Sequence, residues 1–300
     1  MTAVIAFNFK EVVVLLSDIR LTYDPKGHRH EDEMVKVTRL ADNALIGFAG
    51  PLNGALKVVK YIAQRRAEIV RSKKEPMITL RHLSRWFSYV SQKQLTLSER
   101  KHLQCLIVGS HLKHNDNTRG RYSMTKWFFN KERGSIDYSN CSNEKYCVIG
   151  SGEETDVLEP FLDKAYDIHY KEKDAVMMAT DISIKYSLIS SQEHGISSFF
   201  QLFVVTPFGY RHIPYSMIDM TRRSVYSSSF LPPNPWGDDP APTLADVCFT
   251  KISRIGKEGY FVCTETKGEY TLSNPITGQR KKLRVLTKDD PATKLGIRLI

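Results

Sequence analysis

Four short apolar segments in the first fifty residues constrain the fold of this 300-residue chain more than any other feature. Segments 3–7 and 12–16 are rich in β-branched residues and are separated by a polar stretch, which predicts a hairpin of two buried strands. Segment 35–40 alternates around Lys36, and segment 44–50 is apolar and ends in glycine. The chain is therefore expected to begin with buried β-structure.

Two pairs of helical patterns follow. Apolar residues recur at helical spacing over 52–72 and from residue 80 into the high nineties, and a second pair of helices is predicted at 153–170 and 174–189. Further strands are predicted at 103–108, 122–129, 146–149, 199–205 and 210–218. This order favours a layered α+β domain, because strands alternate with pairs of helices: strands, two helices, strands, two helices, strands.

A proline-rich stretch at 227–242 is unsuited to a helix or a central strand and is expected to be a linker or an extended arm. Beyond it, short strand patterns occupy 247–255, 259–266 and 282–286. The predicted parts are a main domain at 1–226, a linker at 227–244 and a small basic β module or sheet extension at 245–300.

Composition excludes several classes of protein. No apolar run approaches the ~18 residues that a membrane-spanning helix needs. The first apolar run is short and is soon followed by Lys10 and Glu11, which is unlike a secretory signal. We therefore expect a cytoplasmic protein without a membrane partner.

The polar side chains give little sign of a metal or another cofactor. The five cysteines are odd in number and form no C-x-x-C pair, which argues against a disulfide framework and a thiolate zinc site. His28, His30, Glu31 and Asp32 have the chemistry of metal ligands. Hydrophilic loops collect such residues without function, and no second cluster is visible, so we expect no metal and no cofactor.

The carboxy-terminal part is basic. The whole chain carries a net charge of +10, and residues 246–300 hold 11 Lys and Arg against 6 Asp and Glu. This charge is compatible with binding to nucleic acid or to an acidic protein face, and equally with a solvated surface. We favour the solvated surface and do not expect nucleic acid to be a partner.

The first two residues carry reactive chemistry if Met1 is removed. Thr2 would then offer a hydroxyl nucleophile and a free α-amine within one residue, and that pair can act as nucleophile and base. Thr2 is small enough for ordinary removal of the preceding Met. Farther along, Asp18 and Arg20 lie two apart on a strand tail and project from the same face.

Five short motifs in this order resemble the proteasome β-subunit family, and the bacterial heat-shock-locus V peptidase is the nearest in character. The motifs are Thr2, Ser17-Asp18-Ile19-Arg20, Val35-Lys36-Val37, Gly47-Phe48-Ala49-Gly50 and Ile149-Gly150-Ser151-Gly152. Lys36 and Gly50 have the mutual spacing of the family. The resemblance covers about residues 2 to 225 and implies a four-layer αββα sandwich, with the active threonine at one edge of the two sheets. It says nothing about the rest of the chain, so the small carboxy-terminal β extension is expected from the strand patterns alone.

The resemblance also implies roles for the residues at the amino-terminal edge. Thr2 matches the nucleophile, and Lys36 matches the lysine whose charge favours a neutral α-amine and the developing alkoxide. Asp18 matches the carboxylate that keeps this lysine charged and aligned, and Arg20 braces the same corner. Gly50 matches the position whose backbone N–H stabilises the oxyanion.

Two further positions are implied less directly. Ser151 matches the serine that hydrogen-bonds the terminal amine. The acid that the family supplies after its fourth helix aligns ambiguously within 190–195, where Glu193 is the candidate. The family usually has a second glycine after Gly50, whereas this chain has Pro51, so the helix start and the neighbouring pocket are expected to differ.

Each motif also has a plain structural interpretation. Asp18 and Arg20 suit an ion pair at a strand end, Lys36 a solvent-facing lysine, Gly50 a turn and Ser151 a helix N-cap. Taken singly, these structural roles are the more common ones. Their joint occurrence behind Thr2 favours catalysis.

The resemblance therefore implies an N-terminal threonine peptidase that cleaves peptides or unfolded proteins through an acyl-enzyme on Thr2. It further implies a homo-oligomeric ring, with an ATP-dependent unfoldase as a candidate partner. Three alternatives remain open: a non-catalytic ring or scaffold protein that retains Met1, an N-terminal-nucleophile amidase acting on a small substrate, and a nucleic-acid binder that uses the basic carboxy-terminal segment.

Overall fold

The structure of the protein is a computed structural model. It describes residues 2–23, 30–72, 77–111, 121–150, 158–190, 196–197, 199–206, 208–218, 260–286 and 298–299. The predicted linker at 227–244 and the predicted strand at 247–255 lie outside the described residues. The division of the chain into domains therefore stays a prediction.

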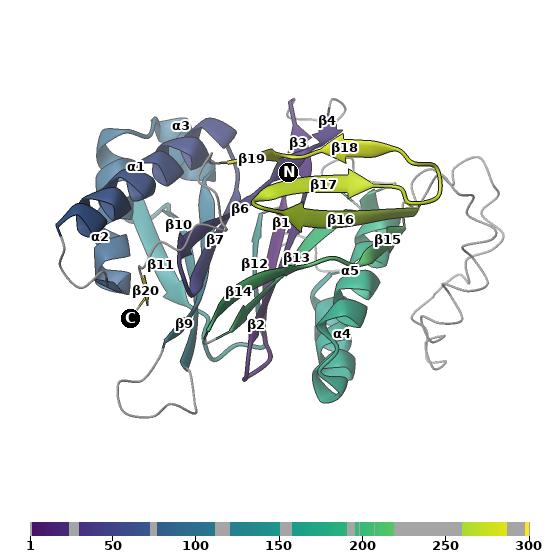
Figure 1. The fold of residues 1–300 in the computed structure, drawn as a ribbon. Coiled ribbons are helices and arrows are strands. Elements are labelled where there is room, and N and C mark those ends of the chain that lie inside the picture. The colour runs from purple at the N-terminus through teal and green to yellow at the C-terminus, as the bar shows by residue number, and fades with distance from the viewer. Residues whose placement is uncertain are drawn as a thin grey trace.

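The first of two five-stranded sheets contains the predicted hairpin at its centre, with strand order β12-β1-β2-β13-β14 (Figure 1). Its strands are β1 (Ala3–Asn8), β2 (Val13–Asp18), β12 (Tyr146–Gly150), β13 (Phe200–Thr206) and β14 (Gly209–Ile213). Strands β1 and β2 run antiparallel, with Ile5 opposite Leu16. Both strands are almost wholly buried, which explains why they are continuous apolar runs instead of alternating ones.

The second five-stranded sheet has the order β11-β10-β9-β7-β6. Its strands are β6 (Val37–Ala41), β7 (Ala44–Ala49), β9 (Gln104–His111), β10 (Arg121–Asn130) and β11 (Ser135–Asn140). Strand β11 has no counterpart among the predicted strands, because its sequence is mostly polar and none of its residues is buried. It lies at the edge of the sheet, where burial leaves little trace in the sequence.

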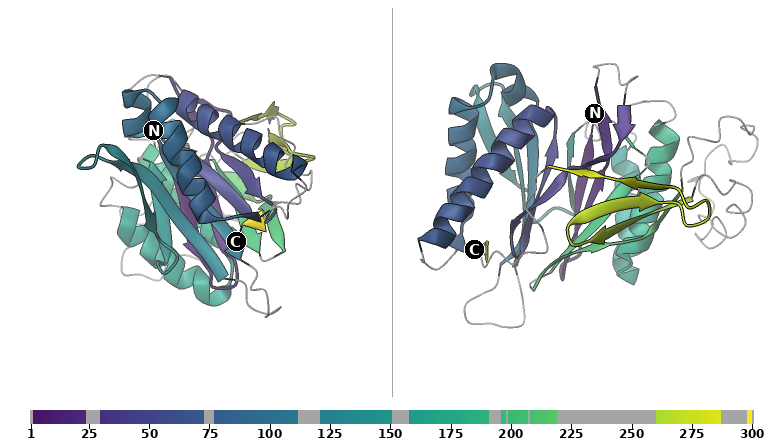
Figure 2. Two further views of the ribbon diagram at one scale, coloured as in Figure 1. Left: turned by 90° about the vertical axis from the view of Figure 1, so that its left-hand side faces the viewer. Right: turned by 45° about the horizontal axis from the view of Figure 1, so that its top comes forward.

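Five helices in the described part of the chain lie in two groups on opposite sides of these sheets, as the right-hand view of Figure 2 shows. They are α1 (Leu52–Arg71), α2 (Leu80–Lys93) and α3 (Leu97–His102) in one group, and α4 (Leu158–Glu172) and α5 (Ala175–Ser190) in the other. The second predicted helix does not run into the high nineties, because Thr96 and Glu99 form a capping box that starts α3 separately. The α+β class agrees with this arrangement.

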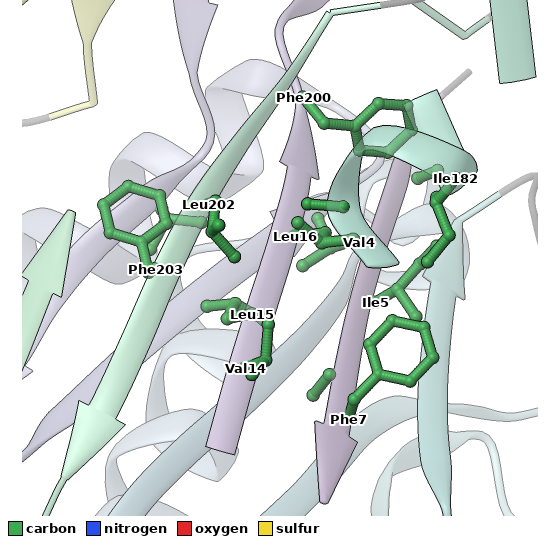
Figure 3. Close-up of a cluster of buried hydrophobic side chains, with 14 of the residues drawn as sticks. Val4, Ile5, Phe7, Val14, Leu15, Leu16, Ile182, Phe200, Leu202 and Phe203 are labelled. Atoms are coloured by element: carbon green, nitrogen blue, oxygen red, sulfur yellow. The ribbon is translucent and has the colours of Figure 1, made fainter. Parts of the chain in front are cut away.

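The apolar core has two parts. One part joins β1, β2 and β13 to α4 and α5, and Figure 3 shows Ile182 of α5 beside Ile5 and Phe7 of β1. The other part joins β7 and β9 to α1 and α2 and includes Phe48 and Leu83. Helices thus cover the outer faces of both sheets.

A smaller sheet, of order β15-β16-β17-β18, comes mainly from the carboxy-terminal part of the chain. Its strands are β15 (Ser216–Ile218), β16 (Tyr260–Thr266), β17 (Glu269–Ser273) and β18 (Arg280–Lys282). Three two-stranded pairs complete the part of the fold that the structure describes: β3 (Arg20–Thr22) with β4 (His30–Asp32), β5 (Met34–Val35) with β19 (Arg284–Val285), and β8 (Met77–Ile78) with β20 (Arg298–Leu299). None of the described helices is long and apolar enough to cross a bilayer.

Candidate active site

Asp18 lies at the end of β2 and is completely buried. Its carboxylate accepts hydrogen bonds from the backbone N–H groups of Ala3 at 2.9 Å, Arg20 at 3.1 Å and Ser197 at 3.4 Å. These three donors supply hydrogen-bond partners that burial would otherwise take from the carboxylate. The end of the central hairpin is therefore built around a buried and hydrogen-bonded carboxylate.

Lys36 stands between β5 and β6 and is 6% exposed. Its Nζ donates to both carboxylate oxygens of Asp18, at 2.8 and 2.9 Å, and to Oγ1 of Thr2 at 2.9 Å. An ammonium group has three N–H donors, and these three acceptors use all of them. The interpretation of Lys36 as a solvent-facing lysine is thus excluded by its burial.

Two opposing effects act on the Lys36 ammonium. Burial lowers its pKa, because the charged form loses hydration, and the neighbouring Asp18 carboxylate raises it. The effect of burial is the larger, so the pKa of Lys36 lies below the ordinary lysine value. A lysine of this kind can gain or lose its proton during a reaction more readily than one at the surface.

Thr2 precedes β1 and is 7% exposed. The next residue, Ala3, is already paired with Gly150 of β12. Gly150 has a φ of +90°, and a Cβ atom at that position would collide with the carbonyl oxygen of Thr2. The threonine is therefore held against a strand end where only glycine fits.

Gly50 follows β7 and has a φ of +106°. A side chain here would collide with the backbone carbonyl of His102, so glycine is required for close packing as well as for conformation. Pro51 is the N-cap residue of α1 and provides no side-chain cap. Gly50 therefore stands at the positive end of a 20-residue helix.

Arg20 contacts Asp18 through its backbone, whereas its guanidinium group binds Asp32. The two bonds to Asp32, from Nε at 2.9 Å and from an Nη at 3.1 Å, form a bidentate pair that ties β3 to β4. Tyr23 donates to Glu31 at 3.0 Å. Two of the carboxylates considered as metal ligands are thus engaged elsewhere, and no group of three or more His, Cys, Asp or Glu within the described ranges could hold a metal.

These residues open into a cleft of about 850 Å³. Thr2, Lys36, Gly50 and Gly150 are among the residues that line it. Apolar side chains also line it, among them Met34, Phe48, Phe128 and Leu286. Lys101, Lys126 and Lys131 also line it. A hydroxyl group, a buried lysine and an exposed backbone glycine therefore line one space, and acyl transfer uses groups of these kinds.

The structure brings together Thr2, Asp18, Lys36, Arg20 and Gly50. Ser151 and Glu193 lie outside the described residues, so their predicted roles are not placed.

Sequence reasoning missed three contributors to the site. They are Ser197, Gln104, whose Oε1 accepts from the backbone N–H of Gly150 at 2.6 Å, and Leu286. Each reaches the site by long-range packing, which leaves no local pattern in the sequence.

Comparison with known proteins agrees with the resemblance drawn from the sequence. The family described as Proteasome subunit has a model that matches residues 2–118. That match contains Thr2, Asp18, Lys36 and Gly50, and it indicates in general terms a peptidase of the N-terminal-nucleophile type. A comparison with curated proteins finds no significant match.

Proposed function

From the premise that residues 2–118 form a proteasome-subunit region, we propose that the protein is an N-terminal threonine peptidase that becomes active when Met1 is removed. The observation that carries the proposal is the 2.9 Å contact between Nζ of Lys36 and Oγ1 of Thr2, with Asp18 behind the ammonium. A nucleophile aligned with a charged group inside a cleft is the arrangement that activates a hydroxyl.

The first step is attack on a peptide carbonyl. The free α-amine of Thr2 accepts the proton of Oγ1, and the oxygen forms a bond to the carbonyl carbon of the substrate. An unperturbed α-amine has a pKa of about 7.7 to 8.0, which suits this transfer near neutral pH. The charge of Lys36 stabilises the developing alkoxide and favours the neutral form of the amine.

The tetrahedral intermediate then needs a donor for its oxyanion. The backbone N–H of Gly50 supplies it, and the positive end of α1 adds a favourable potential. The C–N bond breaks as the leaving amine takes the proton held by the α-ammonium, which leaves an ester on Thr2. Attack by water, with the α-amine again accepting a proton, releases the second product and restores the hydroxyl.

The remaining assignments rest on the family resemblance. Arg20 braces the site through Asp32, Ser151 hydrogen-bonds the α-amine, and Glu193 is the acid after the fourth helix. The finer fold would be a four-layer αββα sandwich at 1–226, followed by the linker and the basic β module. A homo-oligomeric cytoplasmic ring supplied by an ATP-dependent unfoldase fits this function, with peptides or unfolded proteins as substrates.

Two measurements test the proposal. Intact mass of the purified protein should show loss of Met1, and a threonine-directed electrophile should add once, with the adduct mapped to Thr2. The Thr2→Ala variant is the matched control and should not react. Retention of Met1 in every molecule would leave no α-amine on Thr2 and would instead support a non-catalytic ring or scaffold protein.

Substrate class distinguishes the peptidase from its enzymatic alternative. A peptide library should be cleaved by the wild-type protein and left intact by Thr2→Ala. An amidase acting on small molecules would react with the electrophile and yet cleave none of the peptides.

A further inference from the structure

The carboxy-terminal part of the chain reaches the strand that directly precedes Lys36. Strand β19 pairs in parallel with β5, placing Arg284 opposite Met34 and Val285 opposite Val35. The backbone N–H of Arg284 donates to the carbonyl oxygen of Glu33 at 2.6 Å. The Arg284 guanidinium also forms an ion pair with Glu33. Residues more than 240 positions apart in the sequence, beyond the region that the family model matches, therefore meet next to the buried ammonium.

Residues on either side of β19 fix its position. Leu283 is 3% exposed, belongs to the core part that contains β1 and β2, and donates its backbone N–H to the carbonyl of Tyr270 at 2.8 Å. Leu286 is 6% exposed and belongs to the other core part, together with Met34 and Phe48. Two leucines three residues apart are thus inserted into different cores, and the strand between them has little freedom to move.

Leu286 also faces the cleft. It lines the same space as Thr2 and Lys36, next to the apolar wall that Met34 and Phe48 form. Residues 283–286 are named the carboxy-terminal strap. The strap therefore touches the site in two ways, through the backbone that precedes Lys36 and through a side chain in the wall.

We infer that the carboxy-terminal strap is an integral part of the catalytic cleft. It positions Lys36 by holding β5, and Leu286 limits the size of the apolar side chain that the cleft accepts from a peptide. This inference rests on the proposed function for its second half, since selectivity among peptides presupposes cleavage. Its first half concerns the strand alone and is testable without turnover.

Selectivity is tested with peptides in which each position flanking the scissile bond is changed in turn from Ala to Phe. We expect Leu286→Ala to raise kcat/KM for the Phe peptide relative to the Ala peptide by about tenfold at one position, because a pocket discriminates methylene groups by this order. Leu286→Phe should shift the ratio the other way, and Leu286→Met should keep it. Ile276→Ala, at an exposed turn between β17 and β18, is the matched control.

An unchanged ratio in Leu286→Ala, with cleavage intact, would overturn the role of Leu286. Cleavage of no peptide by the wild-type protein would instead overturn the proposed function, and the positioning role would then be decided by hydrogen exchange.

Positioning of Lys36 is tested by amide hydrogen exchange. Arg284→Pro removes the N–H that binds Glu33, and we expect exchange across residues 33–37 to accelerate by at least about tenfold. Arg284→Lys keeps the backbone donor and should exchange like the wild type. Arg284→Gly keeps the amide and loosens the strand, so it should give a smaller change of the same sign if the proline variant does not fold. Unchanged exchange in both Arg284→Pro and Arg284→Gly would overturn the positioning role.

Discussion

The amino-terminal residues 2–50 and the carboxy-terminal residues 260–286 meet at one cleft and contribute different things to it. The first region supplies the polar groups, and its Asp18–Lys36 pair has side chains that are 0% and 8% exposed. The second region supplies an apolar wall residue, and its Lys282–Glu269 pair has side chains that are 64% and 63% exposed. Charge is buried only at a cost, so its presence in the first region marks the place where chemistry is expected.

The strongest test of the difference between the two regions is removal of the Thr2 hydroxyl, the main polar group that the first region supplies. We expect Thr2→Ala to lower kcat by several orders of magnitude, as removal of a covalent nucleophile does in other peptidases, where the loss is on the order of 10⁶-fold. Thr22→Ala is the matched control, since Thr22 lines the same cleft and its hydroxyl has no partner among the described residues. Peptide turnover measures both variants. Equal activity in Thr2→Ala and the wild type would show that Thr2 is not the nucleophile.

The next largest effect is on the free energy of unfolding, which should depend much more on the buried Asp18–Lys36 pair than on the exposed Lys282–Glu269 pair. Lys36→Met leaves Asp18 buried without its cation and should cost about 3–5 kcal/mol in the free energy of unfolding. Lys282→Met removes an exposed pair and should cost under about 1 kcal/mol.

The double variant Asp18→Asn, Lys36→Met is expected to recover part of the stability without recovering activity. Urea denaturation and turnover, measured on the same samples, check this. Recovery of activity in the double variant would show that the pair has a structural role alone.

A glycine on the strand that pairs with β1 sharpens the comparison from the other side of Thr2. Gly150→Ala places a methyl group against the carbonyl of Thr2, so we expect a loss of about 2–5 kcal/mol, from backbone strain and overpacking together, and a displaced Thr2. Gly134 has a φ of +63° and no atom within 4 Å of an added Cβ. Gly134→Ala should therefore lower the free energy of unfolding by about 1–2 kcal/mol, from backbone conformation alone. Thermal unfolding and turnover would reveal the difference. Equal losses in the two variants would mean that the contact with Thr2 is relaxed.

The smallest expected effect is on the pH dependence of activity. Because burial lowers the pKa of Lys36, its ammonium loses the proton below the ordinary lysine value of about 10.4, and activity should fall as the pH rises through the lowered value. The acid limb should follow the α-amine and lie below its unperturbed pKa of about 7.7 to 8.0, because the charge of Lys36 favours the neutral amine. Lys36→Arg keeps its charge at high pH, so its residual activity should lack the alkaline limb. An alkaline limb that persists in this variant would belong to another group.

The strands and most site residues of the first region could be predicted from the sequence, because the patterns that indicate them are local. Asp18, Lys36 and Gly50 sit at strand ends that apolar runs predict, and their order behind Thr2 carries the resemblance. The central hairpin and the α+β class follow from the same runs. Apolar spacing does not separate α3 from α2, whereas the capping box at Thr96 does.

The second region was less accessible because its contribution depends on distant pairing. No pattern around Leu286 says that β19 will pair with β5, or that Leu286 will reach the cleft. Strand β17 lies between two predicted strands and was not predicted itself. Ser197 contacts Asp18 across a separation of 179 residues in the sequence. These contacts join separate elements, so they appear only in three dimensions.

The start of β1 has one further consequence. Ala3 is already fastened into the sheet opposite Gly150, and its amide is bonded to Asp18. An exopeptidase that clips Met1 would next have to peel a strand out of the middle of the protein to go any farther. Under the proposed function, we therefore expect trimming of the folded chain to stop after Met1 and to leave Thr2 as the first residue.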